Sequence, residues 1–565
     1  MLSTRKLGAF PALAESSGCT ALVADLGRPA GYPCRPVDES IPLILFEDDH
    51  LLVIRKPAGW NTHAPSPYAG EGVYDWLRVR EPRWSSLAII HRLDKETSGV
   101  LVFGKSAEAN RSLTAQFAGR EVAKRYRLWT DRPVAFEKKT VTSRIARDGD
   151  SYRSVATGGD EAVTDFRVIR RDGGRTELEA EPHTGRTHQI RVHASESGFP
   201  ILGDSLYGGS PFHRVCLHAA AISFKHPATA STVTFNADDA GFEGESRVAL
   251  RAAIIDPART NAYRLIHGAA DGHPGWFVER LGDWLLSLHE TDPSPAMLKI
   301  LQALVERLGC RGVYHKRWNP RVRETNTAEA SPKLIIGEAA PERFSIRENG
   351  LNYELSFGEG YSVGLFLDQR DNRRRWQNGH VANGFDLGFK PGAEVLNTFA
   401  YTCGFSVAAA ASGARVTSLD LSKKYLDWGR RNLALNGINP AAHDFIFGDC
   451  FDWLRRLAKK GRKFQGVILD PPTFSQSKES GVFRVQKDFG RLVGDALKVL
   501  QPDGVLLASC NAANWPEEEF VSAVHSAVQK SGRKVRAEHY APQPPDFPVS
   551  RDQPAYLKTL WLRLS

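Results

Sequence analysis

Residues 87–104, LAIIHRLDKETSGVLVFG, place a charged turn between two apolar runs. The runs at 87–90 and 100–103 have the length and composition of buried strands. Within the turn the carboxylate of Asp94 lies between two cations, Arg92 and Lys95. Loops between strands often carry charge, so a structural salt bridge is one interpretation. The other is a carboxylate kept ionised by its neighbours and directed into a cleft for covalent chemistry.

Length and composition indicate a globular protein of several domains with a basic excess. The 565 residues exceed one ordinary core, and roughly two to four domains are expected. Lys and Arg number 74 against 65 Asp and Glu, a net charge of +9, which suits a polyanionic partner. Seven scattered cysteines without CxxC spacing predict neither a disulfide framework nor a zinc site. No run approaches about 18 apolar residues, so we expect no membrane span and a cytoplasmic location.

The periodicity of apolar residues changes along the chain. Short apolar runs alternate with turn signals towards the N-terminus, which favours an antiparallel sheet interrupted by a helix at 106–118. Further on, strands are expected near 275–288 and 312–316, with a helix at 295–308 between them. The predicted segments are an N-terminal extension at 1–40, an α+β domain at 41–235, a linker at 236–249, a small α+β middle domain at 250–348 and an α/β domain at 349–565.

The last segment alternates strands with helices. AEVLNTFAY, ARVTSLDLS, DFIFGDC, FQGVILDPP and DGVLLASCN are five apolar runs, each ending in polar or small residues. Such alternation is typical of a parallel, doubly wound, Rossmann-like sheet with its chemistry at the carboxyl ends of the strands.

Three further segments accompany HRLDKETSG in the first domain. KRYRLW contains Tyr126, GRTHQIRVH contains Arg191, and LHAAAISFKHP follows at 217–227. Together these motifs resemble the RluA-type pseudouridine synthases over most of residues 41–235. The resemblance implies isomerisation of uridine to pseudouridine in RNA without a cofactor. It implies that Asp94 is the catalytic residue, Tyr126 the active-site tyrosine and Arg191 the buried arginine.

The residue types fit that chemistry. An arginine within about 4 Å would keep Asp94 ionised in a dry pocket. Tyr126 offers a flat face to the uracil ring and a hydroxyl for proton transfer. The uridine must leave its stack to reach the pocket. A basic run flanks Tyr126, and the histidines lack the ligand spacing of a metal site. The side chains predicted to contact RNA are Arg92, Lys124, Arg186 and His188.

The strand ends of the last domain carry a second set of polar residues. Residues 397–407, NTFAYTCGFSV, follow the first strand and are not a GxGxxG fingerprint. Asp420 ends the next strand, where an acid binds the two hydroxyls of a ribose. Asp449 ends the third strand, where an adenine amino group would be met. Asp470 opens DPPTF after the fourth, a sequence whose carbonyls and aromatic ring can grip a flipped base.

Residues 250–565 resemble the RlmI/RlmK-type large-subunit rRNA methyltransferases, which are class I enzymes dependent on S-adenosyl-L-methionine (SAM). The resemblance rests on TNAYRLIHGAADGHPGWFVERLGDWLL, GLFLDQRDNRRRW, VLNTFAYT and DPPTFSQSK. It implies SAM as cofactor and 23S-type ribosomal RNA as partner. The implied base contacts are Pro472 and Phe474. The implied cofactor residues are Phe366, Arg370, Asn397, Phe399, Gly404, Asp420, Asp449, Asp470 and Pro471.

The methylated atom stays open between guanine N7 and a cytosine carbon. DPPTFSQSK followed by FRVQKDF is closer to the guanine type, whereas Cys510 in LLASCN stands where the cytosine type has its nucleophilic cysteine. A cytosine carbon needs a thiolate to add to the ring first, whereas guanine N7 already has a lone pair. Two alternatives remain for the whole chain: one half is inactive and serves as an RNA-binding platform, or the methyltransferase acts on a small molecule.

Overall fold

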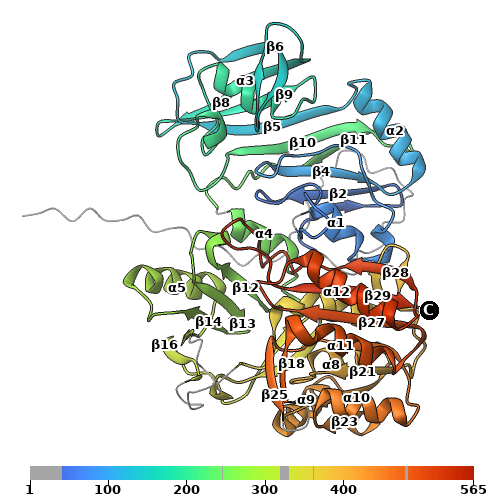
Figure 1. Ribbon diagram of the computed structural model, residues 1–565. Coiled ribbons are helices and arrows are strands. Elements are labelled where there is room, and N and C mark those ends of the chain that lie inside the picture. Colours follow the sequence, from blue (N-terminus) through green and yellow to red (C-terminus); the bar gives the residue numbers. More distant parts are fainter. Residues whose placement is uncertain (1–40, 71, 245, 319–329, 360–361, 478–480) are drawn as a thin grey trace, which may run out of the picture.

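One sheet of eleven strands organises the N-terminal half of the molecule (Figure 1). The computed structural model describes residues 41–70, 72–244, 246–318, 330–359, 362–477 and 481–565, so the predicted extension at 1–40 lies outside it. The strand order is β1-β2-β4-β10-β5-β9-β8-β6-β7, with β11 beside β10 and β3 beside β4. The bounds are β1 (Ile44–Glu47), β2 (Leu51–Lys56), β3 (Ala88–Ile89), β4 (Ser98–Gly104), β5 (Ala123–Thr130), β6 (Lys138–Asp148), β7 (Ser151–Ser154), β8 (Asp160–Asp172), β9 (Arg175–Pro182), β10 (Leu217–Lys225) and β11 (Thr232–Asn236).

One strand pair departs from the predicted antiparallel pattern. β4 runs parallel to β10, pairing Ser98 with His218 and Gly99 with Ala219, while the other pairs of this sheet are antiparallel. A Cβ at Gly99 would lie 2.2 Å from the Ala219 carbonyl oxygen, and its φ is +119°, so this approach requires glycine. The prediction of an antiparallel sheet is therefore wrong at this pair, which joins the strand after Asp94 to the neighbour of β5.

Helices cover both faces of this sheet. The predicted helix at 106–118 is confirmed as α2 (Ala107–Ala118), with the Ser106 hydroxyl accepting from the Ala109 N–H as N-cap. Alternate β4 residues face opposite ways: Val102 packs with α2, and Leu101 packs with α1 (Val73–Arg78). At the other end α3 (Gln189–Glu196) inserts Ile190 among β5, β8 and β9.

Helix α4 (Ser246–Ile254) lies between the two halves (Figure 1). Its Leu250 and Ile254 are buried in the same cluster as Trp60 and Trp76 of the N-terminal half. From the same helix Arg251 donates to the Asp271 carboxylate at 2.6 Å and to the Asp546 carbonyl at 3.0 Å. The stretch predicted as a linker at 236–249 thus runs into a helix that packs into the N-terminal core and is bonded to the C-terminal half.

The middle segment forms a five-stranded sheet in the order β12-β13-β14-β15-β16. One face carries α5 (Pro295–Leu308), whose bounds match the predicted helix. The other face contributes Trp284 and Tyr314 to a core cluster shared with the C-terminal sheet. The strands are β12 (Ala262–His267), β13 (Phe277–Leu281), β14 (Trp284–His289), β15 (Gly312–Arg317) and β16 (Lys333–Gly337), followed by the hairpin β17 (Phe344–Glu348) and β18 (Leu351–Leu355).

The C-terminal sheet has seven strands in the order β23-β22-β21-β24-β27-β29-β28. The five predicted runs form its parallel strands, and β29 is antiparallel to both neighbours. α7 and α8 pack on one face and α10, α11 and α12 on the other, since Val395 faces the first group and Leu396 the second. The strands are β21 (Glu394–Thr398), β22 (Arg415–Asp420), β23 (Asp444–Phe447), β24 (Phe464–Leu469), β27 (Leu500–Cys510), β28 (Val535–Tyr540) and β29 (Lys558–Leu564), with the small pairs β19 (His380–Ala382), β20 (Phe385–Asp386), β25 (Phe474–Ser477) and β26 (Gly481–Arg484) outside the sheet. The helices are α7 (Arg370–Asn378), α8 (Gly404–Ala411), α9 (Lys423–Leu435), α10 (Cys450–Lys459), α11 (Val485–Leu497) and α12 (Glu517–Lys530).

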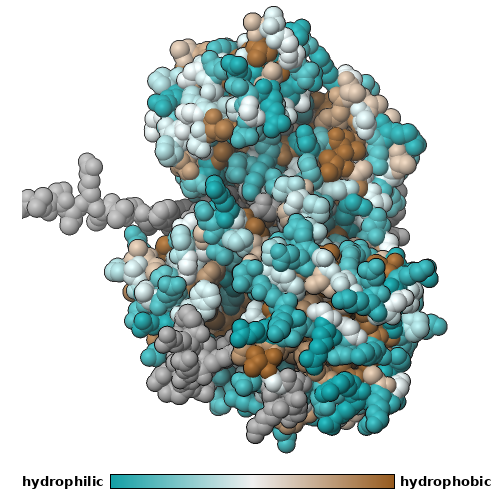
Figure 2. Space-filling view, viewed as in Figure 1, coloured by the Kyte–Doolittle hydropathy of each residue, from teal (hydrophilic) through white to brown (hydrophobic). Residues whose placement is uncertain are grey.

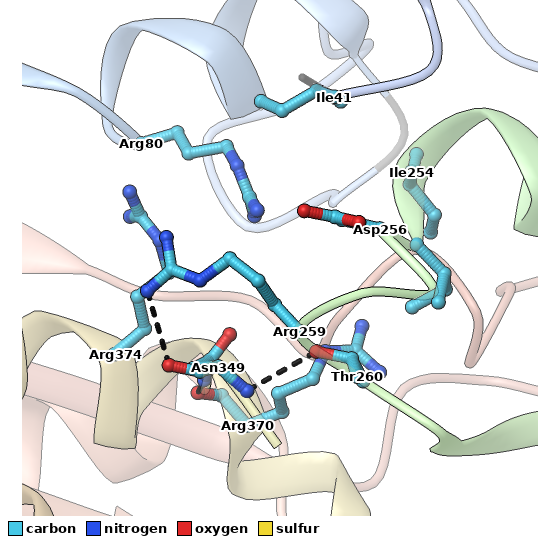
Figure 3. A pocket seen from close by; sticks show the side chains of 10 residues that line it. Ile41, Arg80, Ile254, Asp256, Arg259, Thr260, Asn349, Arg370 and Arg374 are labelled. Atoms are coloured by element: carbon cyan, nitrogen blue, oxygen red, sulfur yellow. Dashed lines mark hydrogen bonds between the residues drawn. The ribbon is translucent and has the colours of Figure 1, made fainter. Parts of the chain in front are cut away.

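Arginines converge where the two halves meet (Figure 3). Arg374 of α7 forms an ion pair across the junction with Glu81. Arg80 points into the same small cavity; burial and then the charge of Arg374 lower its pKa to about 9. Arg259, which lines this cavity, donates to the carbonyl of Asn349 within the C-terminal half. Beside the apolar packing of α4, the two halves therefore also meet through buried charged side chains.

Candidate active sites

The segment after β2 holds the loop that carries Asp94 through hydrogen bonds to the backbone of that loop. Thr62 Oγ1 donates to the Leu93 carbonyl at 2.8 Å and accepts from the Leu93 N–H at 3.1 Å. On the other side of Asp94 the Lys95 carbonyl accepts from the Gly59 N–H at 2.8 Å and from Lys56 Nζ at 3.1 Å. Lys56 is fully buried and also donates to the Trp60 carbonyl at 2.6 Å. The backbone on both sides of Asp94 is thus fixed.

The structure brings Asp94, Arg191 and His188 together. Asp94 Oδ2 lies 3.6 Å from Arg191 Nη1 and 3.7 Å from His188 Nε2, and the carboxylate is 29% exposed. Arg191 is itself held by Asp204 through two hydrogen bonds of 2.7 and 2.8 Å. A guanidinium that cannot turn away keeps positive charge beside a carboxylate that remains open on one side.

His188 occupies a strained position beside this carboxylate. It stands at the N-cap of α3 with φ of +55°, a left-handed conformation that non-glycine residues seldom adopt. Its Nδ1 lies 2.7 Å from the Tyr207 hydroxyl, and burial lowers its pKa. The ring is therefore neutral near pH 7, with Nε2 toward Asp94.

Tyr126 lies in β5 and packs against the core clusters on both sides of it. Burial, and next the charge of Asp94, raise the pKa of its phenol. A phenol in this environment stays protonated at neutral pH and acts as a hydrogen-bond donor.

The three basic side chains predicted to contact RNA differ in their surroundings. Arg92 is exposed to solvent. Lys124 Nζ donates to the Thr184 carbonyl at 3.1 Å, and burial lowers its pKa. Arg186 Nε donates to the Glu161 carbonyl at 3.0 Å. Lys124 and Arg186 are thus each held by a backbone carbonyl, Lys124 by that of Thr184 and Arg186 by that of Glu161 in β8.

The loop after β21 has an unusual backbone. Phe399, Tyr401 and Cys403 alternate in the left-handed region, with φ of +54°, +49° and +65°. The Tyr401 N–H donates to Asp420 Oδ2 at 2.8 Å, and the Ser422 N–H donates to Oδ1 of the same carboxylate at 2.8 Å. Burial raises the pKa of Asp420. The carboxylate at the end of β22 is therefore hydrogen-bonded directly to the backbone of the strained loop.

Other predicted cofactor residues take supporting positions. Asn397 is buried and donates to Ser406 Oγ of α8 at 2.9 Å. Asp449 caps α10 by accepting from the Asp452 N–H at 3.0 Å. Arg370 is buried in a bidentate ion pair with Asp546 at 2.6 and 2.9 Å. A Cβ at Gly404 would lie 2.9 Å from Leu365, so glycine allows α8 to approach the segment before α7.

Two neighbouring carboxyl groups, Asp470 and Asp368, lie near the end of β24. Burial, and next the charge of Asp368, raise the pKa of Asp470 to about 7. Asp368 accepts from the Tyr556 hydroxyl at 3.0 Å, and burial raises its pKa also. Pro471 is buried, Pro472 is exposed and Phe474 is half-buried. A carboxyl whose pKa is raised well above its ordinary value thus stands at the start of an exposed turn.

Cys510 ends β27 and is fully buried. Its sulfur accepts from the Ala512 N–H at 3.4 Å, and burial raises the pKa of the thiol to about 11. The charge of Asp470 acts on the same thiol, so the two groups are neighbours.

Two family models match separate regions of the chain. One, described as RNA pseudouridylate synthase, matches residues 50–196, which contain Asp94, Tyr126 and Arg191. The other, described as S-adenosylmethionine-dependent methyltransferase, matches residues 263–563, more than half of the chain. The chain belongs to the S-adenosylmethionine-dependent methyltransferase family. It carries an RNA pseudouridylate synthase domain in front of the methyltransferase region.

The curated relatives of this methyltransferase agree with the assignment. The Ribosomal RNA large subunit methyltransferase of Deinococcus radiodurans is 33% identical over 329 residues, 57% of this chain and 78% of that protein. The Ribosomal RNA large subunit methyltransferase I of Klebsiella pneumoniae (strain 342) is 32% identical over 314 residues, 54% of this chain and 75% of that protein. The solved structure of Human RNA Pseudouridylate Synthase Domain Containing 1 is 25% identical and covers 36% of this chain and 85% of that chain, with a TM-score of 0.31. The C-terminal region is homologous to the RlmI-type enzymes.

Several residues of both domains escaped the sequence analysis. Asp204 and Tyr207 lie in GDSLYGG, a segment for which no role was predicted. The methyltransferase domain has a pair of exposed apolar side chains at strand ends: Leu421, directly after β22, is 40% exposed, and Phe447, the last residue of β23, is 59% exposed. Asp420 is paired with Phe447 in the register of β22 and β23, so these side chains share one edge. For Leu421 the available signal was an apolar residue directly after a strand-end acid.

Most of the face in Figure 2 is hydrophilic, with apolar side chains in separate patches. No helix in the described ranges is long and apolar enough to cross a membrane. Within those ranges no group of three or more His, Cys, Asp or Glu side chains is arranged to hold a metal ion.

Proposed function

We propose that this chain is a bifunctional RNA-modifying enzyme. One domain isomerises uridine to pseudouridine, and the other methylates a base, with large-subunit ribosomal RNA as the common substrate class. The observation that carries the first activity is the placement of Arg191 between Asp94 and the buried Asp204. The family match and the RlmI-type relatives support the second.

Asp94 is the proposed nucleophile of the isomerase. Its carboxylate is open on one side and has a fixed guanidinium on the other, which suits covalent attack on a flipped-out nucleoside. Tyr126 would stack against the uracil and keep its proton, so it serves as donor rather than base. Arg92, Lys124, Arg186 and His188 are the proposed contacts to the RNA. No cofactor is needed, because the bond broken and the bond formed balance within the substrate.

The strand-end edge of the C-terminal sheet is the proposed SAM site. Asp420 is oriented by two backbone N–H groups and can accept from both ribose hydroxyls. Leu421 and Phe447 offer exposed apolar surfaces for the adenine ring. Phe366 is 47% exposed with its ring 5.3 Å from that of Tyr401, at the side proposed for the methionine end. The residues present therefore fit SAM, which supplies the methyl group when bound.

The remaining predicted cofactor residues have indirect proposed roles. Asn397 supports α8, Asp449 caps α10, and Arg370 anchors Asp546, so each would hold the site through a neighbour. Phe399 and Gly404 belong to the strained loop and the helix start beside Asp420. Asp470 and Pro471, followed by Pro472 and Phe474, would border the target base.

The choice between guanine N7 and a cytosine carbon turns on Cys510. Methylation of a cytosine carbon requires the Cys510 thiolate as nucleophile. Asp470 is the carboxyl that neighbours this thiol. Guanine N7 requires no nucleophile from the protein, in keeping with a buried thiol of raised pKa. Cys510→Ala is expected to abolish methylation in the first case and to leave it near the wild-type rate in the second. Cys216→Ala in the other domain is the matched control.

Mass spectrometry of ribosomal RNA incubated with the protein and methyl-labelled SAM tests the whole proposal. Asp94→Asn is expected to form no pseudouridine while binding SAM and transferring methyl groups as the wild type does. Asp172→Asn, at the exposed end of β8, is the control. Pseudouridine formed by Asp94→Asn would refute the nucleophile assignment. Absence of one modification from the wild-type reaction would favour the alternative in which that half is only an RNA-binding platform.

A further inference from the structure

The segment that supports the Asp94 loop also touches the methyltransferase domain. Residues 56–62 hold both neighbours of Asp94 through the hydrogen bonds of Thr62, Gly59 and Lys56. Farther along the same segment, the ring of Tyr68 packs edge-on against that of Tyr540, with centroids 4.8 Å apart. Contact between the domains is therefore made by the same short stretch of chain that fixes the catalytic loop.

The surface it meets consists of Tyr540, the last residue of β28, and the loop 541–549, APQPPDFPV, between β28 and β29. Gly70 approaches this loop so closely that a Cβ there would lie 3.1 Å from both the Gln543 carbonyl oxygen and Pro542 Cβ. Gly59 and Trp60 line a small cavity with Gln543, Pro544 and Phe547 of the loop. Backbone on one side and stiff pyrrolidine rings on the other form this junction.

Loop 541–549 is rigid for reasons visible in its own contacts. Four prolines limit its backbone freedom, since each fixes φ near −65°. Gln543 Nε2 donates to the Phe547 carbonyl at 2.6 Å, closing the loop on itself. Asp546 is fully buried and accepts from Arg370 of α7 and from the Arg264 N–H at 3.0 Å. Arg251 of α4 donates to its carbonyl.

These contacts form a continuous support from the methyltransferase core to the isomerase site. Arg370 holds Asp546, the loop holds residues 59–70, and those residues hold the backbone on either side of Asp94. Displacement of a reacting group by about 1 Å can lower a rate on the order of a hundredfold. A rigid buttress under the Asp94 loop therefore has a direct bearing on catalysis.

We propose that loop 541–549 of the methyltransferase domain is a positioning element for the pseudouridine synthase site. It acts through residues 59–70 and not by touching the RNA. The inference rests on the proposed role of Asp94. It assigns to the C-terminal domain a role in the reaction of the N-terminal one, so the two activities are joined by structure as well as by covalent fusion.

Gly70→Val in the full chain tests this inference, because the added methyl groups would press on Gln543 and Pro542. Its φ does not require glycine, so the change adds bulk without backbone strain. We expect kcat for pseudouridine formation to fall about tenfold, with KM for RNA and the methyl-transfer rate of the same sample within about twofold of wild type. Methyl transfer reports the fraction of folded enzyme in each sample. Gly244→Val, in an exposed loop where a Cβ would meet only ordinary contact, is the matched control and should behave as wild type.

Tyr68→Ala and Tyr540→Ala provide a second test, since they remove a contact instead of adding one. Each should lower kcat for pseudouridine severalfold, and the double variant should be no worse than the more impaired single one. Should Gly70→Val lose both activities together, these variants decide the matter. Wild-type kcat in them, or in a folded Gly70→Val, would overturn the positioning role. With Asp94→Asn run in parallel, failure of the proposed role of Asp94 is recognised separately, because that variant would then still form pseudouridine.

Discussion

Arg191 and Asp204 form a buried bidentate ion pair, Nε to Oδ2 at 2.7 Å and Nη2 to Oδ1 at 2.8 Å, with side chains 7% and 1% exposed. The remaining nitrogen, Nη1, lies 3.6 Å from Asp94 Oδ2. The Arg191 guanidinium thus contacts two carboxylates. The buried carboxylate of Asp204 fixes its orientation beside the partly exposed carboxylate of Asp94. The Tyr207 ring, 4.9 Å from the guanidinium carbon, closes another side.

Asp204→Asn should therefore impair both stability and pseudouridine formation. The amide keeps the shape but loses the charge, leaving Arg191 buried with a weaker partner, which costs about 3 kcal/mol of unfolding free energy. Arg191 is then free to turn toward Asp94, and kcat should fall at least about tenfold. Denaturant unfolding and a pseudouridine assay measure the two effects. Asp503→Asn, at an exposed carboxylate that pairs with Arg563, should change stability by less than about 1 kcal/mol.

Asp420→Ala should weaken SAM binding. Hydrogen bonds to a charged group contribute about 1.5–3 kcal/mol, which corresponds to a loss of affinity on the order of ten- to a hundredfold. Isothermal titration calorimetry measures it directly. Asp427→Ala, on the exposed side of α9, is the control. Unchanged affinity in Asp420→Ala would remove the ribose assignment.

Phe447→Ala should separate binding from folding. The ring is 59% exposed, so its removal should change stability by no more than about 0.5 kcal/mol. A ring that packs on adenine contributes about 1 kcal/mol, so SAM affinity should fall about fivefold. Leu435→Ala, also exposed and on α9, should leave affinity unchanged. Equal affinities for both variants would place the adenine elsewhere.

Asp470 should make the stability of the SAM-free protein depend on pH. Its pKa in the folded protein is about 7, above the ordinary value of 3.8, so between these pH values the folded state holds a proton that the unfolded state has lost. Its contribution to the unfolding free energy therefore falls as pH rises from about 4 to 7 and is constant above that. Asp470→Asn should be less sensitive across this window, as followed by denaturant unfolding at pH 5 and pH 8. A wild-type slope in the variant would contradict the raised pKa.

Local patterns were enough to predict much of the fold. Apolar spacing located α2 and α5, and the five runs of the C-terminal sheet, because each depends on neighbours within one element. Motif recognition selected Asp94 and Arg191, which the structure brings within 3.6 Å although 97 residues separate them. That proximity is a tertiary fact, which only the resemblance made predictable.

What escaped prediction depends on distant pairing or on unusual backbone. The parallel partner of β4 is more than a hundred residues away, and Arg370 meets Asp546 across 176 residues, so no spacing signals either. The left-handed backbone at Phe399, Tyr401 and Cys403 could not be predicted, because glycine, the usual residue in that conformation, is absent from these positions. The packing of α4 into the N-terminal core likewise depends on surfaces that no single segment reveals.

Because Ser98 and Gly99 pair with His218 and Ala219, β4 stays without one neighbour until the ribosome has translated past β10. Long-range closure of this kind slows folding and leaves an unpaired strand edge exposed meanwhile. The nascent chain must therefore be more than a third complete before Asp94 acquires its surroundings. An N-terminal fragment released earlier would contain the HRLD motif but lack β10, the strand that pairs with β4 directly after this motif.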